Sequence, residues 1–149
     1  MYELDEKDMV ILDTLKKNSQ LSIGKISRKT GIPVATVHNR IKKMKANGVI
    51  SAYTIKVNPE KLGRKMVAYV LVKATQKTDQ ATMLKEISKH AFVEYCSMVT
   101  GEFDLIFRIR VKDMEELNSF VLKYLRLLDQ VAETRTMISY ENIENENVF

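Results

Sequence analysis

The side chains best suited to recognition chemistry in this chain lie on one predicted helix. Thr36, His38 and Asn39 can exchange hydrogen bonds with the edges of bases in a DNA groove. Lys42 and Lys43 follow within about one turn, and long cations of this kind bind phosphate oxygens. Short polar residues followed by long basic ones are typical of a helix that enters the major groove of duplex DNA.

The segment around this helix carries charge of only one sign. Between Thr14 and Pro59 there are ten Lys and Arg residues and no Asp or Glu. Residues 1–64 hold 13 basic and six acidic residues, whereas residues 65–149 hold 11 and 13. Because like charges repel one another, this imbalance favours a polyanionic partner for the first half. A basic surface helix that binds nothing remains the alternative.

Three helices are expected to position these side chains. The first spans about residues 6–17, with Asp5 as its N-cap and Asp8 in its first turn, where a negative charge complements the helix dipole. Its predicted apolar stripe contains Met9, Ile11, Leu12 and Leu15. The second helix is capped by Ser22 and ends at Gly31, with Ile23 and Ile26 facing inward.

The third helix begins near Pro33 and completes a helix-turn-helix unit. Its core face is predicted to consist of Val34, Val37, Ile41 and Met44. The opposite face and its flanks, together with the outer face of the second helix, would contact DNA. The expected DNA-binding residues are Lys25, Arg28, Ala35, Thr36, His38, Asn39, Arg40, Lys42 and Lys43.

Gly48 ends the third helix, and residues 49–57 are rich in β-branched and aromatic side chains. This extended segment is expected to be a wing beside the helix-turn-helix or a linker strand. Asn58-Pro59 and Gly63 then mark a boundary. We therefore expect a DNA-binding domain over residues 1–50, an extended wing or hinge over 51–64, and a second domain over 65–149.

The second half alternates strand, helix, strand, strand, helix, strand. Strands are predicted at 66–74, 93–100, 103–111 and 131–143, with Gly101-Glu102 forming a tight hairpin between the middle two. Asp79 can cap a helix that ends near His90, and Asp113 with Glu116 resembles a capping box for the other. This order predicts an α+β, ferredoxin-like βαββαβ fold with both helices on one face.

The other face of this sheet also contains apolar residues, among them Val67, Tyr69, Leu71 and Ile106. A sheet covered on one side only should be polar on its exposed side. A second copy of the chain is the expected cover, and a two-fold dimer also suits DNA sites with repeated halves.

Several classes of function are disfavoured. The chain has no Gly-rich phosphate loop and no Cys/His spacing of a metal site, so we expect no enzyme activity, cofactor or metal. No apolar run approaches the roughly 20 residues that span a membrane, and no signal peptide is recognisable. The single cysteine, Cys96, cannot form an internal disulfide, which fits a cytoplasmic protein.

Taken together, the motifs resemble those of the Lrp/AsnC family of feast/famine transcription regulators over nearly the whole length. The N-terminal pattern is Leu4-Asp5, Asp8, Ile11-Leu12, Leu15 and Asn18, followed by Gly31, Thr36-Val37-His38-Asn39-Arg40-Ile41 and Gly48-Val49-Ile50. Tyr53 and Leu62-Gly63 match the hinge, and Val99-Thr100-Gly101-Glu102-Phe103-Asp104 matches the effector module.

The resemblance implies a DNA-binding regulator that dimerises, often assembles into octamers, and responds to small molecules, often amino acids. It implies an effector site at the turn between residues 101 and 104, with Asp104 as a partner for the ligand's ammonium group. The candidate effector residues are Thr100, Gly101, Glu102, Asp104, Thr134 and Thr136. An Asp104 that only satisfies nearby backbone remains the alternative for this site. For the whole protein, the alternative is an architectural protein that binds DNA independently of sequence.

Overall fold

Two separate apolar cores divide the chain into two units. The computed structural model describes residues 2–143; the first unit extends to Lys56 and the second begins at Val57. Residue 1 and residues 144–149, which the sequence-based division assigns to the two domains, lie outside the described residues.

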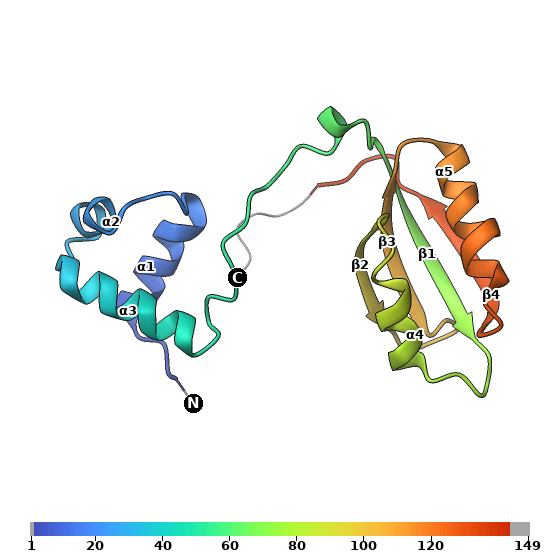
Figure 1. Ribbon diagram of the computed structural model, residues 1–149, viewed down its shortest axis with the longest axis horizontal. Helices are drawn as coiled ribbons and strands as arrows, with labels where there is room; N and C mark the ends of the chain where they lie inside the picture. Colours follow the sequence, from blue (N-terminus) through green and yellow to red (C-terminus); the bar gives the residue numbers. More distant parts are fainter. Residues whose placement is uncertain (1, 144–149) are drawn as a thin grey trace. The chain divides into compact units, whose positions relative to one another are not determined.

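Three helices form the first unit: α1 (Glu6–Lys17), α2 (Ile23–Thr30) and α3 (Val34–Ala46) (Figure 1). Ser22 accepts a hydrogen bond from the backbone N–H of Lys25 and so caps α2. Gly31 ends the helix with φ of 71°, a left-handed conformation that glycine adopts without a steric penalty. The predicted helix-turn-helix is confirmed. Its core consists of Ile11, Leu15, Ile26, Ile32, Val37, Ile41 and Met44.

Three residues of this unit differ from the prediction. Met9 and Val34, expected in the core, are 42% and 54% exposed, whereas Asp8, expected to complement the helix dipole and not to join the core, is 1% exposed. The buried stripe of α1 is Asp8, Ile11 and Leu15, and Met9 lies about 100° around the helix from Asp8. An acidic side chain has therefore taken a core position.

The predicted wing does not form a paired strand within residues 2–143. Residues 51–58 lie outside any helix or ladder, and the next element is the short 3₁₀-helix η1 (Glu60–Leu62). Tyr53, Ile55 and Val57 are exposed on this segment. Strand-forming residues need a partner strand to receive their hydrogen bonds, and the segment has none here.

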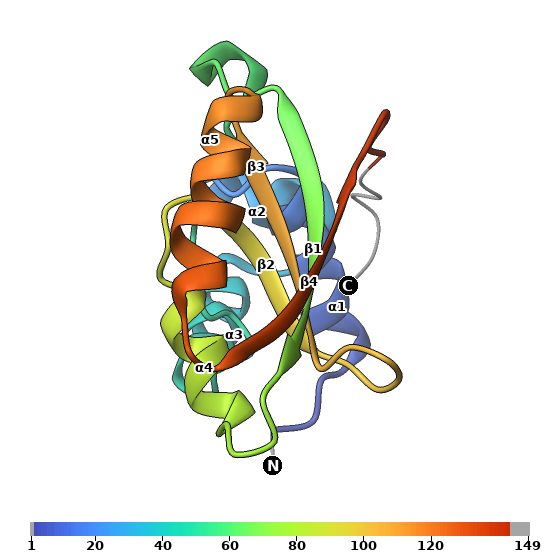
Figure 2. The same ribbon diagram turned by 90° about the vertical axis from the view of Figure 1, so that its right-hand side faces the viewer.

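The second unit is a four-stranded sheet with helices on one face (Figure 2). Its elements are β1 (Met66–Ala74), α4 (Gln80–Ile87), β2 (Val93–Met98), β3 (Leu105–Val111), α5 (Met114–Asn118) and β4 (Val131–Ile138). The strand order is β2-β3-β1-β4, and every neighbouring pair is antiparallel. The predicted βαββαβ fold is confirmed, and its core lies between the sheet and the helices.

Several boundaries differ from those predicted. The tight hairpin at Gly101-Glu102 is wrong: β2 ends at Met98 and β3 begins at Leu105, so the connection spans residues 99–104. Within it Phe103 is buried, and the Arg135 guanidinium lies 4.8 Å from the centre of its ring. The last strand ends at Ile138, before the predicted 143.

The helix after Asp113 is regular only at its start. It widens into a π-helix, η2 (Ser119–Tyr124), and tightens into a 3₁₀-helix, η3 (Leu125–Leu127). This winding buries Leu117, Phe120, Val121 and Leu125 against the sheet. Among the helices of residues 2–143, none has both the length and the apolarity needed to cross a membrane.

Candidate nucleic-acid interface

Core packing decides which side of α3 faces outward. Val37, Ile41 and Met44 are buried against α1 and α2, so the remaining face points away from the unit. The residues predicted to contact DNA on that face are accessible, with Thr36 half-buried and the others exposed: Ala35, His38, Asn39, Lys42 and Lys43. Lys25 and Arg28 of α2 are exposed as well.

The cations of this face differ in how strongly the protein itself engages them. Within residues 2–143, the ammonium groups of Lys42 and Lys43 form no ion pair, and both can therefore bind an external anion. The Lys45 ammonium instead lies 4.6 Å from the centre of the Tyr53 ring, within cation–π range.

Arg40 differs from its neighbours because its guanidinium is held inside the unit. Its Nη1 lies 2.7 Å from an Asp5 carboxylate oxygen and 2.9 Å from Oδ1 of Asp8. The Arg40 side chain is 23% exposed, and that of Asp8 is 1% exposed. These two carboxylates raise the pKa of Arg40, and the group remains a cation. Sequence reasoning expected Arg40 at the DNA; the structure places its charge against α1.

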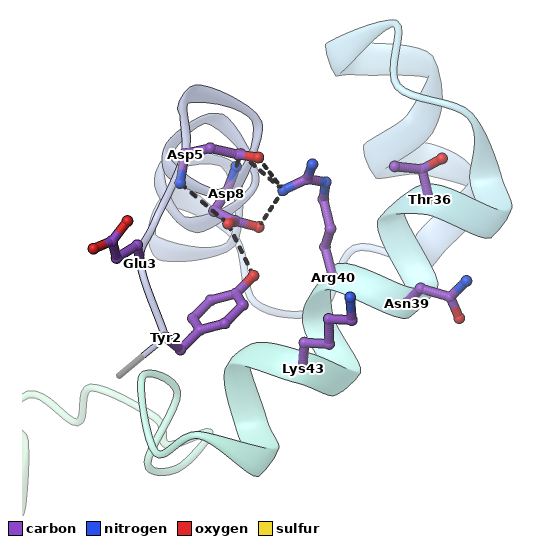
Figure 3. A pocket seen from close by; sticks show the side chains of 8 residues that line it. All are labelled: Tyr2, Glu3, Asp5, Asp8, Thr36, Asn39, Arg40 and Lys43. Carbon is purple, nitrogen blue, oxygen red and sulfur yellow. Dashed lines mark hydrogen bonds and ion pairs between the residues drawn. The ribbon is translucent and has the colours of Figure 1, made fainter.

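The start of α1 holds these carboxylates in place (Figure 3). Asp5 and Asp8 form a reciprocal capping box, and the Tyr2 hydroxyl donates a hydrogen bond of 2.9 Å to Oδ2 of Asp8. The backbone N–H of Asp8, aided by Arg40, holds the pKa of Asp5 below its usual value. Partial removal from water and the bond to Asp8 raise the pKa of Tyr2.

A pocket of about 360 Å³ opens beside this cluster. Its lining joins the acidic N-terminal residues to the candidate DNA-reading face of α3 (Figure 3): Tyr2, Glu3, Asp5, Asp8, Thr36, Asn39, Arg40 and Lys43. Sequence reasoning missed Tyr2 and the burial of Asp8. The available signal was the position of Asp8, three residues before Ile11 and therefore on the apolar stripe.

The candidate effector residues of the second unit do not gather on one surface. Thr100, Gly101 and Glu102 are exposed on the β2–β3 connection, and Glu102 pairs with Arg135 at 3.3 Å. Asp104 instead accepts hydrogen bonds from the Ala74 backbone N–H and the Gln80 side-chain amide, at 2.7 and 2.9 Å.

Thr134 and Thr136 lie on the helix-covered face of the sheet. They pair with Val72 and Val70, which belong to the buried core, and opposite residues in an antiparallel ladder share a face. Thr134 also accepts a hydrogen bond from Arg126 at 3.1 Å. Thr134 and Arg126 also line a second pocket of about 320 Å³, together with Val131, Ala132 and Glu133.

The face of the sheet opposite the helices is partly apolar, as predicted. Tyr69, Leu71 and Ile106 are half-buried there, and Val67 is 1% exposed. Arg108 and Arg110 share the carboxylate of Glu94 on the same side.

Comparison with known proteins agrees with both halves of this description. The Lrp/AsnC ligand binding domain matches residues 67–149, and a winged helix-turn-helix DNA-binding domain matches residues 4–51. An uncharacterized HTH-type transcriptional regulator of Pyrococcus furiosus is 36% identical over 145 residues, which cover 96% of this chain and 97% of that protein.

Two solved structures share the fold over nearly their whole length. A transcriptional regulator of Neisseria meningitidis, in complex with L-Met, has a TM-score of 0.89 at 23% identity and covers 96% of this chain and 94% of its own. The feast or famine regulatory protein of M. tuberculosis, complexed with L-methionine, has a TM-score of 0.85 at 23% identity and covers 99% of both chains. The family match over residues 67–149 and the identity of 36% to the Pyrococcus furiosus protein show that the chain belongs to the Lrp/AsnC family of helix-turn-helix transcriptional regulators.

Proposed function

We propose that this regulator reads a specific duplex sequence through the exposed face of α3. The observation that carries the proposal is that Thr36 and Asn39, which can bond base edges, are followed about one turn later by Lys42 and Lys43, two cations without an ion pair among residues 2–143. Lys25 and Arg28 supply further phosphate contacts from α2. Ala35 allows close approach, and His38 lies at the flank of the reading face. Arg40 is left out of the contact set because its charge is already paired.

Selection of bound sequences from a random duplex pool tests this proposal. A regulator with a reading helix enriches one motif, and its affinity for that motif exceeds its affinity for random DNA by a factor of about 10³ or more. An architectural protein enriches no motif. Asn39, an exposed amide on α3, favours the first outcome, because such an amide can form two hydrogen bonds with an adenine edge.

The protein is further proposed to act as a homodimer formed through the open face of its sheet. Tyr69, Leu71 and Ile106 provide apolar area on that face, and a two-fold axis would bring two such faces together. A dimer places two copies of α3 on two half-sites of an operator. Assembly of dimers into octamers, and action in the cytoplasm, are proposed on the family resemblance.

An amino acid is the proposed effector, and the β2–β3 connection is its proposed site. Two proteins of the same fold are solved with methionine bound. Here Glu102 and Arg135 present opposite charges 3.3 Å apart, both more than half exposed, which match the ammonium and carboxylate of an amino acid. Thr134 pairs with Val72, as Leu105 does, so it lies at the same end of the sheet but on the helix-covered face, opposite Arg135.

Calorimetric titration with each of the twenty amino acids tests the effector proposal. A ligand that binds the wild type and fails to bind Glu102→Ala supports the site. Equal binding to both proteins would move the site elsewhere, and no binding at millimolar concentration would exclude an amino-acid effector.

A further inference from the structure

Arg40 occupies a border position on α3. At about 100° per residue, Thr36 and Lys43 lie about 40° and 60° from Arg40 on one side, and Met44 and Val37 lie at similar angles on the other. The first pair belongs to the proposed DNA-reading face, and the second pair is buried. Arg40 therefore lies between the reading face and the core, where its contacts bear on the rotation of α3 about its axis.

The partners of Arg40 fix that direction. Its Nη1 contacts both Asp5 and Asp8, at 2.7 and 2.9 Å, and such charge-assisted bonds are short and directional. Asp8 cannot swing away, because Oδ2 accepts hydrogen bonds from the Tyr2 hydroxyl and the Asp5 backbone N–H. Asp5 is held in turn by the backbone N–H of Asp8.

The apolar core of this unit constrains α3 in a different way. Burial of Val37, Ile41 and Met44 decides which face of α3 is outward, but apolar contacts have no directional preference of their own. The Arg40 cluster joins the N-terminus of α1 to the middle of α3, at the level of Asn39. This directional contact adds to core packing in holding the reading face in one orientation.

We propose that Arg40 is a positioning residue for DNA recognition, which sets the orientation of Thr36, Asn39 and Lys43 through its ion pairs with Asp5 and Asp8 and binds no phosphate itself. The inference rests on the proposed sequence-specific binding and adds a contact within the first unit that orients the residues responsible for it. It separates two roles that basic residues on one helix have: Lys42 and Lys43 attract the duplex, whereas Arg40 aligns the groups that read it.

The test needs variants that keep the unit folded. Arg40→Ala alone leaves the buried Asp8 carboxylate without its cation, which is strongly destabilising. The double variant Arg40→Gln, Asp8→Asn is the informative one, because it removes both charges and keeps hydrogen-bonding groups of similar size. Arg40→Lys is the second variant, because it keeps a cation but lacks the planar guanidinium geometry. Lys43→Ala is the matched control on the same face.

Two quantities are measured for each folded variant in the full chain: the ratio of affinities for the selected and a random duplex, and the slope of log affinity against log salt concentration. In both Arg40 variants this ratio of affinities should fall by a factor of about ten or more, which is the effect expected when one base contact is lost. The random-DNA slope of the double variant should match the wild type, whereas Lys43→Ala should lower its slope by about 0.9 and keep most of the ratio.

Two results would overturn the inference while leaving the proposed function intact. A slope lowered by about 0.9 in the double variant, with the ratio preserved, would make Arg40 a phosphate ligand. An unchanged ratio with an unchanged slope would reduce the cluster to a structural element. A wild-type protein that prefers no sequence would instead contradict the proposed function itself.

Discussion

The carboxylate of Asp104 accepts the backbone N–H of Ala74 at 2.7 Å, across the end of the sheet. Its second oxygen accepts a hydrogen bond from the Gln80 side chain at 2.9 Å, and its own backbone N–H donates to Val72. One side chain thus joins the β2–β3 connection to the end of β1 and the first turn of α4. These bonds occupy the group that the family resemblance assigns to a ligand's ammonium.

Replacing Asp104 by Ala should destabilise the second unit. The change leaves the Ala74 N–H and the Gln80 amide without their acceptor, which costs ~1–3 kcal/mol in the free energy of unfolding. Urea unfolding followed by circular dichroism measures the loss, with Glu102→Ala, an exposed neighbour, as the control. If Asp104→Ala had unchanged stability but no longer bound an amino acid, Asp104 would be a ligand-binding residue and not a stabilising one.

Asn39→Ala should weaken binding to the selected duplex and hardly affect random DNA. The exposed amide can form two hydrogen bonds with one adenine, and losing them costs ~1–3 kcal/mol on the preferred site. Fluorescence anisotropy at fixed salt concentration measures both affinities. Equal losses on the two duplexes would show that Asn39 reads no base.

Lys42→Ala should weaken binding to all duplexes alike. Each phosphate contact releases counterions, so its removal lowers the log–log salt slope by about 0.9. Titrations between low and moderate salt measure the slope, and Lys61→Ala, a cation outside the helix-turn-helix, should leave it unchanged. A wild-type slope in Lys42→Ala would mean that this lysine serves only solvation.

Leu71→Glu should convert the protein to a monomer if the open sheet face forms the dimer. The substitution places a charge in the middle of that face, where a buried unpaired carboxylate is costly. Sedimentation velocity at micromolar concentration measures the change, with Lys123→Glu on the exposed helix side as the control. A dimer that survives Leu71→Glu would place the interface elsewhere.

His90 should make the second unit less stable at mildly acidic pH. Its ring packs against Phe92, Phe120 and Tyr124 at 4.8–4.9 Å, and its Nδ1 lies 3.3 Å from the Phe92 backbone N–H, which donates to it. Burial lowers the pKa of His90 below its ordinary value of 6.5. The Glu86 carboxylate is the negative charge near Tyr124, one of the rings that pack against His90.

Because the unfolded chain binds the proton more tightly, the contribution of His90 is fully present above pH 6.5 and is lost as the pH falls through its folded pKa. Denaturant unfolding between pH 7.5 and 5 measures this slope. His90→Gln keeps an acceptor for Phe92 and should flatten the profile, while His38→Gln, on the exposed face of α3, should not. A slope that persists in His90→Gln would assign it to other groups.

The order of elements follows from interactions within four residues along the chain, and for this reason it could be predicted. Asp5, Ser22, Asp79 and Asp113 each accept a hydrogen bond from a backbone N–H two or three positions ahead, so the starts of α1, α2, α4 and α5 are determined locally. The alternation of Ala68, Val70 and Val72 likewise places these residues on one face of β1, and the fold shows that this is the face covered by the helices.

The roles of individual charged residues depended on partners far away in the sequence. Arg40 resembles its basic neighbours in the sequence, and only the fold brings it to Asp8, 32 positions earlier, where the pair can share a buried site. Asp104 meets Ala74 across 30 positions for the same reason. Local periodicity determined which face of α3 points outward. The tertiary structure decided which of its cations remain available to DNA, because an ion pair depends on distance in space.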